Sequence, residues 1–289
     1  MTHPKSHSSP PSALVGLIRP VNSIMMGIAV IIGEVAIAGR IPSITQMVLG
    51  FLVSFSLTAS AMVVNDIVDL EIDRINAPTR PLPSGRISRN QALVFGGVLA
   101  LLGVASALAL SPLLFAIAVV TFLVSLTYNL YGKKLGLPGN IMVGFTIAVP
   151  FLFGGITVSG TINFDIASFF SLAFLATVGR EITKGIADVI GDKVKGIKTI
   201  AIVHGSRVAA VSAAAFYLAA VSISPIPFLY GNLGIYYLLI VLIVDAGFIF
   251  SSAQIIRNHN RDAALRVKGQ ARLWMLLALL AFFVGGLTH

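Results

Sequence analysis

The chain has 289 residues, of which 56% are hydrophobic and only 11% are charged, and its mean hydropathy is +0.94. Soluble domains carry about 25% charged residues, so this composition excludes a soluble globular domain and favours a polytopic membrane protein. The chain has no cysteine, which excludes disulfides, thiolate nucleophiles and iron–sulfur clusters.

Apolar stretches follow one another along almost the whole chain. Residues 1–13 are polar, and we expect a disordered tail followed by a single membrane domain over residues 14–289. About 20 residues cross the hydrocarbon core. The predicted spans are 14–33, 43–64, 91–110, 113–131, 141–159, 166–184, 208–228, 233–254 and 272–288. The sequence therefore predicts an all-α bundle of nine transmembrane helices around a central cavity that opens to the cytoplasmic side.

The basic residues fall almost entirely on one side of this topology. If the N-terminus lies in the cytoplasm, all of the 20 lysines and arginines except Arg40 lie in inner segments. The positive-inside rule then predicts an integral protein of the cell membrane whose N-terminus is cytoplasmic and whose C-terminus lies outside. This distribution accounts for the formal net charge of +9 without a nucleic-acid partner.

The carboxylates gather in two clusters. The first follows the second predicted span and contains Asp66, Asp69, Glu71 and Asp73. The second follows the sixth predicted span and contains Glu181, Asp188 and Asp192. Both spans run in the same direction across the membrane, so we expect both clusters at its cytoplasmic edge, which hints at a parallel internal duplication.

Two triplets within these clusters share one spacing. Residues at i, i+4 and i+8 are Asn65, Asp69 and Asp73 in the first cluster, and Lys184, Asp188 and Asp192 in the second. Carboxylates one helical turn apart repel each other unless cations neutralise them. Mg²⁺ prefers oxygen ligands, usually takes one or two carboxylates and shares a substrate phosphate. The clusters therefore predict two Mg²⁺ ions with a diphosphate between them; the alternative is a solvated interfacial face.

Basic and polar residues near these clusters are candidates for holding an anion. They are Arg19 and Asn22 in the first span, Arg80 and Lys198 in the loops after the clusters, and Tyr128, Lys133 and Lys134 near the loop after the fourth span. Arg19 precedes a proline inside an apolar segment, where a cation is costly and tends to be functional. For any single loop residue, a role in setting the membrane topology is the alternative.

Two stretches of sequence resemble the motifs of the UbiA superfamily of intramembrane prenyltransferases. They are NDIVDLEIDRINAPTRPLPSG (65–85) and DVIGDKVKGIKT (188–199). The nine spans and the opening RPVN (19–22) fit as well. Within the superfamily, REITKGIADVIGDK (180–193) looks most like archaeal digeranylgeranylglyceryl phosphate synthases, although ADVIGD and TIAIVHG depart from the patterns that are common there.

This resemblance implies particular roles for these residues. Two Mg²⁺ ions would be held by Asn65, Asp66, Asp69, Asp73, Asp188 and Asp192, and the catalytic residues among these would be Asp69, Asp73, Asp188 and Asp192. The diphosphate of a polyprenyl donor would be held by Arg19, Arg74, Lys133, Lys134 and Lys184, with Tyr128 and Asn22 nearby. Arg80, Arg86 or Lys198 would hold the phosphate of a lipophilic acceptor.

The implied reaction moves a geranylgeranyl group from geranylgeranyl diphosphate to the free hydroxyl of geranylgeranylglyceryl phosphate. The product would be a precursor of membrane ether lipids. An aromatic acceptor or a chlorophyllide is an alternative within the superfamily. No obligate protein partner is expected beyond the surrounding membrane lipids.

A secondary transporter is the alternative from another class. Transporters also carry charges at membrane depth, but their binding sites lie near the bilayer midplane. The acidic clusters here are expected at one edge of the membrane, beside long basic loops, which favours an enzyme that handles phosphate.

Overall fold

A computed structural model describes residues 10–194, 196–231 and 233–288 of the protein. Over these ranges it contains no strand, and its helices are α1 (Pro10–Leu17), α2 (Pro20–Ala38), α3 (Ile44–Val68), α4 (Leu70–Asn76), α5 (Arg89–Leu110), α6 (Pro112–Leu130), η1 (Gly132–Lys134), α7 (Leu137–Ser159), α8 (Phe164–Ala187), α9 (Val189–Val194), α10 (Ile200–Val203), α11 (Ser206–Ile223), α12 (Ile226–Leu229), α13 (Ile235–Arg257) and α14 (Arg261–Leu287). Nine segments of the described chain are long and apolar enough to cross a membrane, if α11 and α12 are counted as one, Ser206–Leu229. The predicted all-α class with nine spans is confirmed, and the chain is an integral membrane protein.

The predicted first span, 14–33, is divided into two helices at Arg19. Pro20 has no backbone N–H to donate, so it begins α2 instead of continuing α1. Residues 10–13 of the predicted tail belong to α1, whereas residues 1–9 lie outside the described residues. Burial explains this helix: Ala13 and Leu17 are 0% exposed and pack in a cluster that includes Ile87.

The last predicted span, 272–288, also differs from the structure. α14 begins at Arg261, after Asn260 accepts a hydrogen bond from the Ala263 backbone N–H and so caps the helix. Arg266 and Lys268 lie within this helix. Charged residues end the apolar run but are good helix formers, so the hydropathy pattern underestimated the length of this helix.

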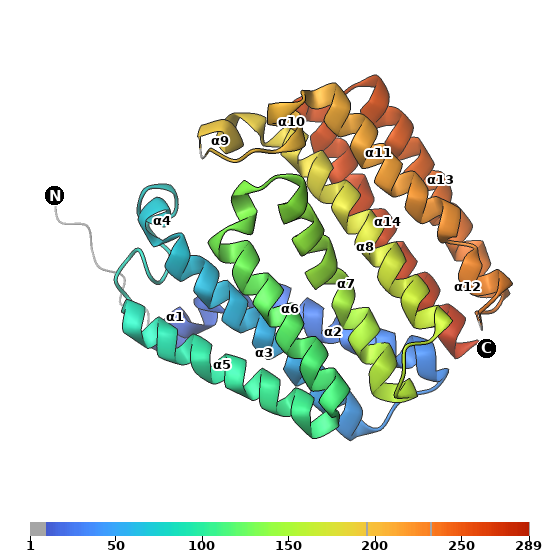
Figure 1. Ribbon diagram of the computed structural model, residues 1–289, viewed down its shortest axis with the longest axis horizontal. Helices are drawn as coiled ribbons and strands as arrows, with labels where there is room; N and C mark the ends of the chain where they lie inside the picture. Colours follow the sequence, from blue (N-terminus) through green and yellow to red (C-terminus); the bar gives the residue numbers. More distant parts are fainter. Residues whose placement is uncertain (1–9, 195, 232, 289) are drawn as a thin grey trace.

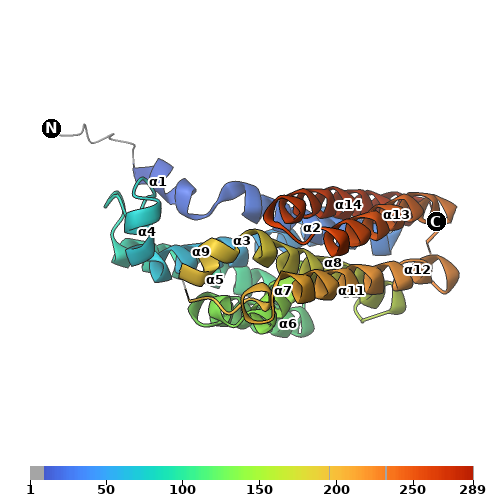
Figure 2. The same ribbon diagram turned by 90° about the horizontal axis from the view of Figure 1, so that it is seen from above.

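The helices form two neighbouring groups (Figure 1). α3, α5 and α6 lie on one side, α8, α11, α13 and α14 lie on the other, and α2 and α7 pack between them. α4 and α9, which follow the two acidic spans, lie at the same end of the bundle, with the turn between α6 and α7 beside them. The same arrangement is visible from above in Figure 2. Large apolar side chains such as Leu101, Val120 and Phe250 are exposed on the outer surface, as contact with lipid requires.

Glycines allow α2 and α7 to pack closely. A Cβ atom added at Gly154 on α7 would meet the Val30 carbonyl oxygen and would lie 2.9 Å from the Glu34 backbone nitrogen, both on α2. A Cβ atom added at Gly33 on α2 would likewise lie 3.0 Å from the Phe151 Cα on α7. Small residues at such contacts let membrane helices approach through their backbones.

We expect Gly154→Ala to destabilise the protein, because the new methyl group presses on backbone atoms that have no rotamer to change. Overpacking of this kind costs about 1–3 kcal/mol. The matched control is Gly97→Ala on α5, where nothing lies within 4 Å of the added Cβ. Thermal unfolding in detergent should show a lower melting temperature for Gly154→Ala and an unchanged or higher one for Gly97→Ala. Equal melting temperatures would contradict the close packing of α2 and α7.

Candidate active site

The two acidic motifs have the same backbone geometry. Each long helix ends one residue before an aspartate, and a short helix follows: α3 and α4 meet at Asp69, and α8 and α9 meet at Asp188. These two aspartates have similar dihedral angles, φ −86° and ψ 4° for Asp69 and φ −102° and ψ 9° for Asp188. Backbone hydrogen bonds of the i to i−4 type continue through both breaks, from Asp73 to Asp69 at 2.8 Å and from Asp192 to Asp188 at 2.9 Å. The i, i+4, i+8 spacing in the sequence is therefore kept as a helical register.

Three carboxylates of the first motif form ion pairs with basic residues. Arg19 donates to Asp66 at 2.6 Å, and Lys133 donates to Asp69 at 2.8 Å. Arg80 donates to Asp73 at 2.5 Å, and its guanidinium also lies 3.8 Å from Asp66. The Asp66 side chain is only 3% exposed, so this carboxylate needs a partner to be buried as an ion. The motif therefore binds three separate segments of the chain to one point.

Arg19 reaches Asp66 from a strained backbone. Its φ is 46°, and it is the one non-glycine residue with a positive φ among the residues that the structure describes. Such a conformation costs on the order of 1 kcal/mol or more and persists where the surroundings impose it. Here the break between α1 and α2 places the guanidinium at the end of α3.

The turn between α6 and α7 connects the two motifs. Lys133 in η1 pairs with Asp69 of the first motif, and the Lys134 carbonyl accepts a hydrogen bond from the Lys198 backbone N–H at 3.2 Å. Lys198 belongs to the loop after the second motif. Tyr128, at the end of α6, lies within electrostatic range of Asp69 and Asp192. The segment from Tyr128 to Lys134 thus stands between the acidic residues of the two halves.

The second motif carries an ion-pair group of its own. Glu181, whose side chain is 10% exposed, accepts hydrogen bonds from Arg180 at 3.2 Å and from Lys184 at 3.1 Å. Lys184 lies within electrostatic range of Tyr128 and Asp188. This group places a half-exposed ammonium beside the second pair of aspartates.

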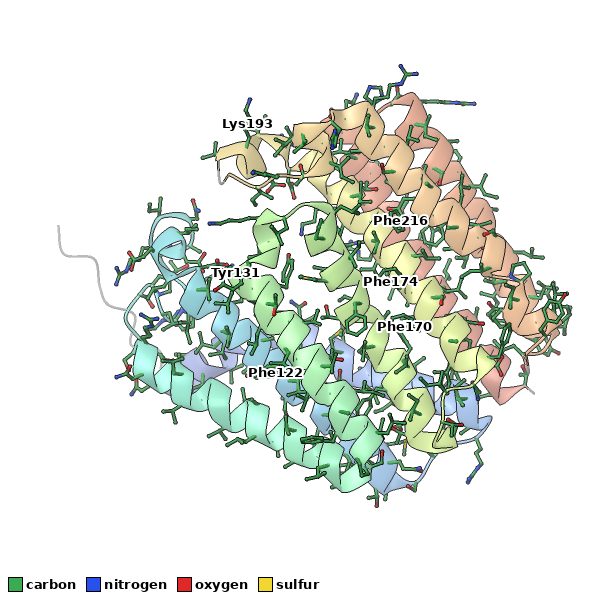
Figure 3. The ribbon with its side chains drawn as sticks, viewed as in Figure 1. Phe122, Tyr131, Phe170, Phe174, Lys193 and Phe216 are labelled. Atoms are coloured by element: carbon green, nitrogen blue, oxygen red, sulfur yellow. The ribbon has the colours of Figure 1, made fainter. Side chains whose placement is uncertain are left out.

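A cavity of about 500 Å³ opens beside the first motif. Its mouth is lined by Arg19, Asn22, Asn65, Asp69, Tyr128 and Lys133. Its body lies between α2, α3, α6 and α7 and is mostly apolar, with Met25, Leu57 and Phe153 among its walls. Phe122, on α6, also lines it (Figure 3). A charged mouth on an apolar body suits a molecule with an anionic head and a hydrocarbon tail.

Several predicted residues do not line this cavity. Arg74 forms an exposed ion pair with Glu71 at 2.8 Å. Other predicted residues that are absent from the lining are Asp66, Asp73, Arg80, Lys134, Lys184, Asp188, Asp192 and Lys198. Asp66, Asp73 and Arg80 lie behind the mouth in the ion pairs described above, whereas the second motif lies across from it. The cavity is therefore lined by α2, α3, α6 and α7, and neither α8 nor the described part of the second motif contributes to it.

Further polar residues of the cavity wall were missed from the sequence. Asn129 lines the cavity, is buried, and donates to the Ala61 carbonyl at 2.9 Å. Thr58 and Ser125 also contribute to the walls. In the sequence, each of them is an isolated polar residue within an apolar span. That pattern alone does not show whether the residue lines a cavity or contacts another helix.

The donor set suits a hard cation such as Mg²⁺. No group of three or more acidic or histidine side chains converges on one point within the described chain. Mg²⁺ does not require such a group, because it usually takes one or two carboxylates together with waters and substrate phosphates. The paired aspartates and the asparagine of the first motif offer only oxygen ligands of this kind.

Comparisons with known proteins agree with this geometry. The profile of the UbiA prenyltransferase family matches residues 26–284. The chain is 37% identical over 274 residues to a digeranylgeranylglyceryl phosphate synthase of Methanothermobacter thermautotrophicus, covering 95% of this chain and 96% of the relative. It is 36% identical over 271 residues to the protein of the same name from Methanocaldococcus jannaschii, covering 94% and 95% of the two chains.

Solved structures show the same fold. One, described as giving structural and mechanistic insights into digeranylgeranylglyceryl phosphate synthase in membranes, aligns with a TM-score of 0.89 at 34% identity and covers 97% of this chain and 99% of that chain. A UbiA homolog from Archaeoglobus fulgidus bound to GPP and Mg²⁺ aligns with a TM-score of 0.69 at 19% identity, covering 93% and 99%. Together with the motifs, the membrane bundle and the cavity, these likenesses establish that the chain belongs to the UbiA prenyltransferase family.

Proposed function

We propose that this chain transfers a geranylgeranyl group from geranylgeranyl diphosphate to the free hydroxyl of geranylgeranylglyceryl phosphate. The products are an ether-lipid precursor and diphosphate. The observation that carries the proposal is the cavity, whose charged mouth joins an apolar body that runs into the bundle. Relatives named as synthases of this lipid at 36–37% identity over nearly the whole chain favour this acceptor over an aromatic one.

Mg²⁺ is the proposed cofactor, as two ions at the mouth of the cavity. Asn65, Asp66, Asp69 and Asp73 would supply ligands from the first motif, and Asp188 and Asp192 from the second. When bound, Mg²⁺ stabilises negative charge on the diphosphate. The similar backbone breaks at Asp69 and Asp188 support a related role for the two motifs.

The cations of the mouth hold and orient the leaving group. Arg19 and Lys133 line the cavity, and Arg80 lies behind them, near Asp66, which it shares with Arg19, and paired with Asp73. Their charges offset the charge that develops on the diphosphate as the allylic C–O bond breaks, and fixed donors of this kind are a major source of catalysis. Arg74 is a weaker candidate, because its guanidinium is held by Glu71 at the surface.

The apolar body protects the reactive allyl group. The electron pair of the C–O bond leaves with the diphosphate, which gives an allyl cation that water would quench. Walls such as Phe122 and Phe153 exclude water and present apolar and aromatic surface to the chain. The hydroxyl oxygen of the acceptor then forms the new C–O bond, and its proton passes to the departing diphosphate or to a motif aspartate.

The acceptor phosphate is proposed to bind between the two halves. Lys184 is half exposed beside the second motif, and Lys198 lies next to Lys134 through their backbones. Arg80 and Arg86 are further candidates from the loop after α4. The ion pairs lie at the ends of α3 and α8 rather than at their middles, which argues against a secondary transporter, whose binding site lies near the bilayer midplane.

The proposed orientation places α4, α9 and η1 in the cytoplasm, with the N-terminus on the same side and the C-terminus outside. The distribution of lysine and arginine supports it. In Figure 1 the end of α14 lies opposite to α4 and α9, as an odd number of spans requires.

A product assay with labelled geranylgeranyl diphosphate tests the function. The purified protein should release diphosphate in the presence of Mg²⁺ and label geranylgeranylglyceryl phosphate, in preference to hydroxybenzoate, dihydroxynaphthoate and chlorophyllide. If an aromatic acceptor were labelled instead, the proposed acceptor would be wrong and the prenyl-transfer activity would stand. Absence of diphosphate release with every acceptor would overturn the enzyme assignment.

We expect Asp69→Ala and Asp188→Ala each to lower the transfer rate by at least about a hundredfold, because each removes a proposed contact with the charge of the transition state. Glu71→Ala is the matched control, since Glu71 is exposed and forms its ion pair with Arg74 at the surface. Steady-state rates over a Mg²⁺ titration, with melting temperatures as a check on folding, measure the effect. A folded Asp188→Ala protein with full activity at low Mg²⁺ would refute the role of the second motif.

The orientation predicts where reporters become active. A reporter that works only in the cytoplasm should be active when fused after residue 134 and inactive when fused after residue 289. A reporter that works only outside should give the opposite pattern. Cytoplasmic activity at the C-terminal fusion would exclude the N-in, C-out topology.

A further inference from the structure

Glu34 is a buried acidic residue that has no part in the site described above. Glu34 lies in α2, its side chain is 0% exposed, and neither of its carboxyl oxygens has a hydrogen-bond partner among the described residues. By contrast, Asp245 in α13 accepts a hydrogen bond from Ser224 at 2.6 Å. An unpartnered carboxyl in a membrane span is costly, and such residues are functional more often than not.

Glu34 lies just beyond the end of the cavity that is farther from its mouth. The lining runs along α2 from Arg19 to Val30 and along α3 from Asp69 to Val53. Glu34 follows Val30 by one helical turn, on the side away from the mouth. The carboxyl group therefore occupies the layer directly after the last lining residues.

The neighbouring helices α3 and α7 lie directly against Glu34. On α3, a Cβ atom added at Gly50 would meet the Glu34 carboxyl oxygen and would lie 2.9 Å from Val30. On α7, Gly154 brings the backbone against Val30 and Glu34. Two glycines thus bring α3 and α7 against α2, and the carboxyl group of Glu34 fills the remaining gap.

The length of the cavity fits a long prenyl chain. Asp69 and Val53 are separated by 69 − 53 = 16 residues of lining helix, which corresponds to about 24 Å. This is the length scale of a diphosphate followed by an extended geranylgeranyl chain. A longer chain would have to push its apolar end against Glu34.

We propose that Glu34 closes the prenyl-chain cavity and sets the maximum length of the donor chain. The inference rests on the proposed function, because it takes the cavity as the site of the donor tail. If the end wall were apolar, a longer prenyl chain that displaced it would still gain dispersion contacts with it. A buried carboxyl group offers no such gain, and burying it against hydrocarbon without a hydrogen-bond partner costs additional free energy. Glu34 therefore selects by polarity as well as by volume.

The test compares donors that differ by isoprene units. Geranyl, geranylgeranyl and geranylfarnesyl diphosphates are assayed for transfer to geranylgeranylglyceryl phosphate, and their unreactive thiolodiphosphate analogues are assayed for binding. The variants are Glu34→Ala and Glu34→Val, which shorten the side chain, and Glu34→Gln, which keeps its size and polarity. Asp245→Asn is the matched control for a change at a buried carboxylate outside the cavity.

Wild-type protein should favour the geranylgeranyl donor over the geranylfarnesyl donor. Shortening Glu34 should raise the ratio of the longer donor to the geranylgeranyl donor by about tenfold, because additional methylene groups become buried. Glu34→Gln and Asp245→Asn should leave this ratio within about twofold, since both keep the volume of the end wall. Glu34→Val provides the same comparison if Glu34→Ala does not fold.

An unchanged ratio in both the transfer and the binding assays of the shortened variants would overturn the inference. The same shift in Asp245→Asn would also overturn it, because it would indicate general loosening of the bundle. The proposed function fails separately, if wild-type protein transfers no prenyl group to this acceptor. Chain-length selection by Glu34 in the binding assay would then still stand.

Discussion

Pairing of the first-motif carboxylates with cations from other segments is the interaction on which the site depends. A buried or half-buried carboxylate beside hydrocarbon is costly without a partner. Asp66 therefore holds the strained break at Arg19, Asp73 holds Arg80 in the loop after α4, and Asp69 holds Lys133 in η1. Each pair fixes the position of a neighbouring segment relative to the end of α3. The mouth of the cavity is the result of these three connections.

The same charges suit the chemistry proposed for the site. A diphosphate that carries divalent cations presents both signs of charge, and the mouth offers both within one ion-pair group. Carboxylates attract the cations, and the guanidinium and ammonium groups attract phosphate oxygens. Groups that balance one another in the protein are thus complementary to a metal–diphosphate complex, and the apolar body behind them accepts the tail. The residues that stabilise the mouth through ion pairs are therefore the same residues that are proposed to bind the substrate.

Local patterns were readable from the sequence, whereas contacts between distant segments were not. Hydropathy gave the spans, and the i, i+4 spacing gave the helical register of Asp69 and Asp73, because both depend on neighbours along the chain. The pair between Arg19 and Asp66 joins residues 47 positions apart, and that between Lys133 and Asp69 joins residues 64 apart. The position of Glu34 at the end of the cavity is harder still to predict. Glu34 stands in an apolar span without any cluster or motif, and its place becomes visible only when Gly50 and Gly154 bring three helices together.

The two acidic motifs share the same helix break, but the helices before them have different roles. Asp69 and Asp188 break their helices at similar angles, yet α3 lines the cavity and α8 does not. The residues before each break explain the difference. Asn65 is uncharged and lines the cavity, whereas the residue at the same spacing in the second half is Lys184, which is paired with Glu181 beside it. A Cβ atom added at Gly185 would lie 3.4 Å from the Thr199 Cβ, so α8 packs against the loop that follows its own motif. The apolar chamber is therefore lined by α2, α3, α6 and α7, whereas α8 and the second motif keep their charges outside it, where the phosphate of the proposed acceptor would bind.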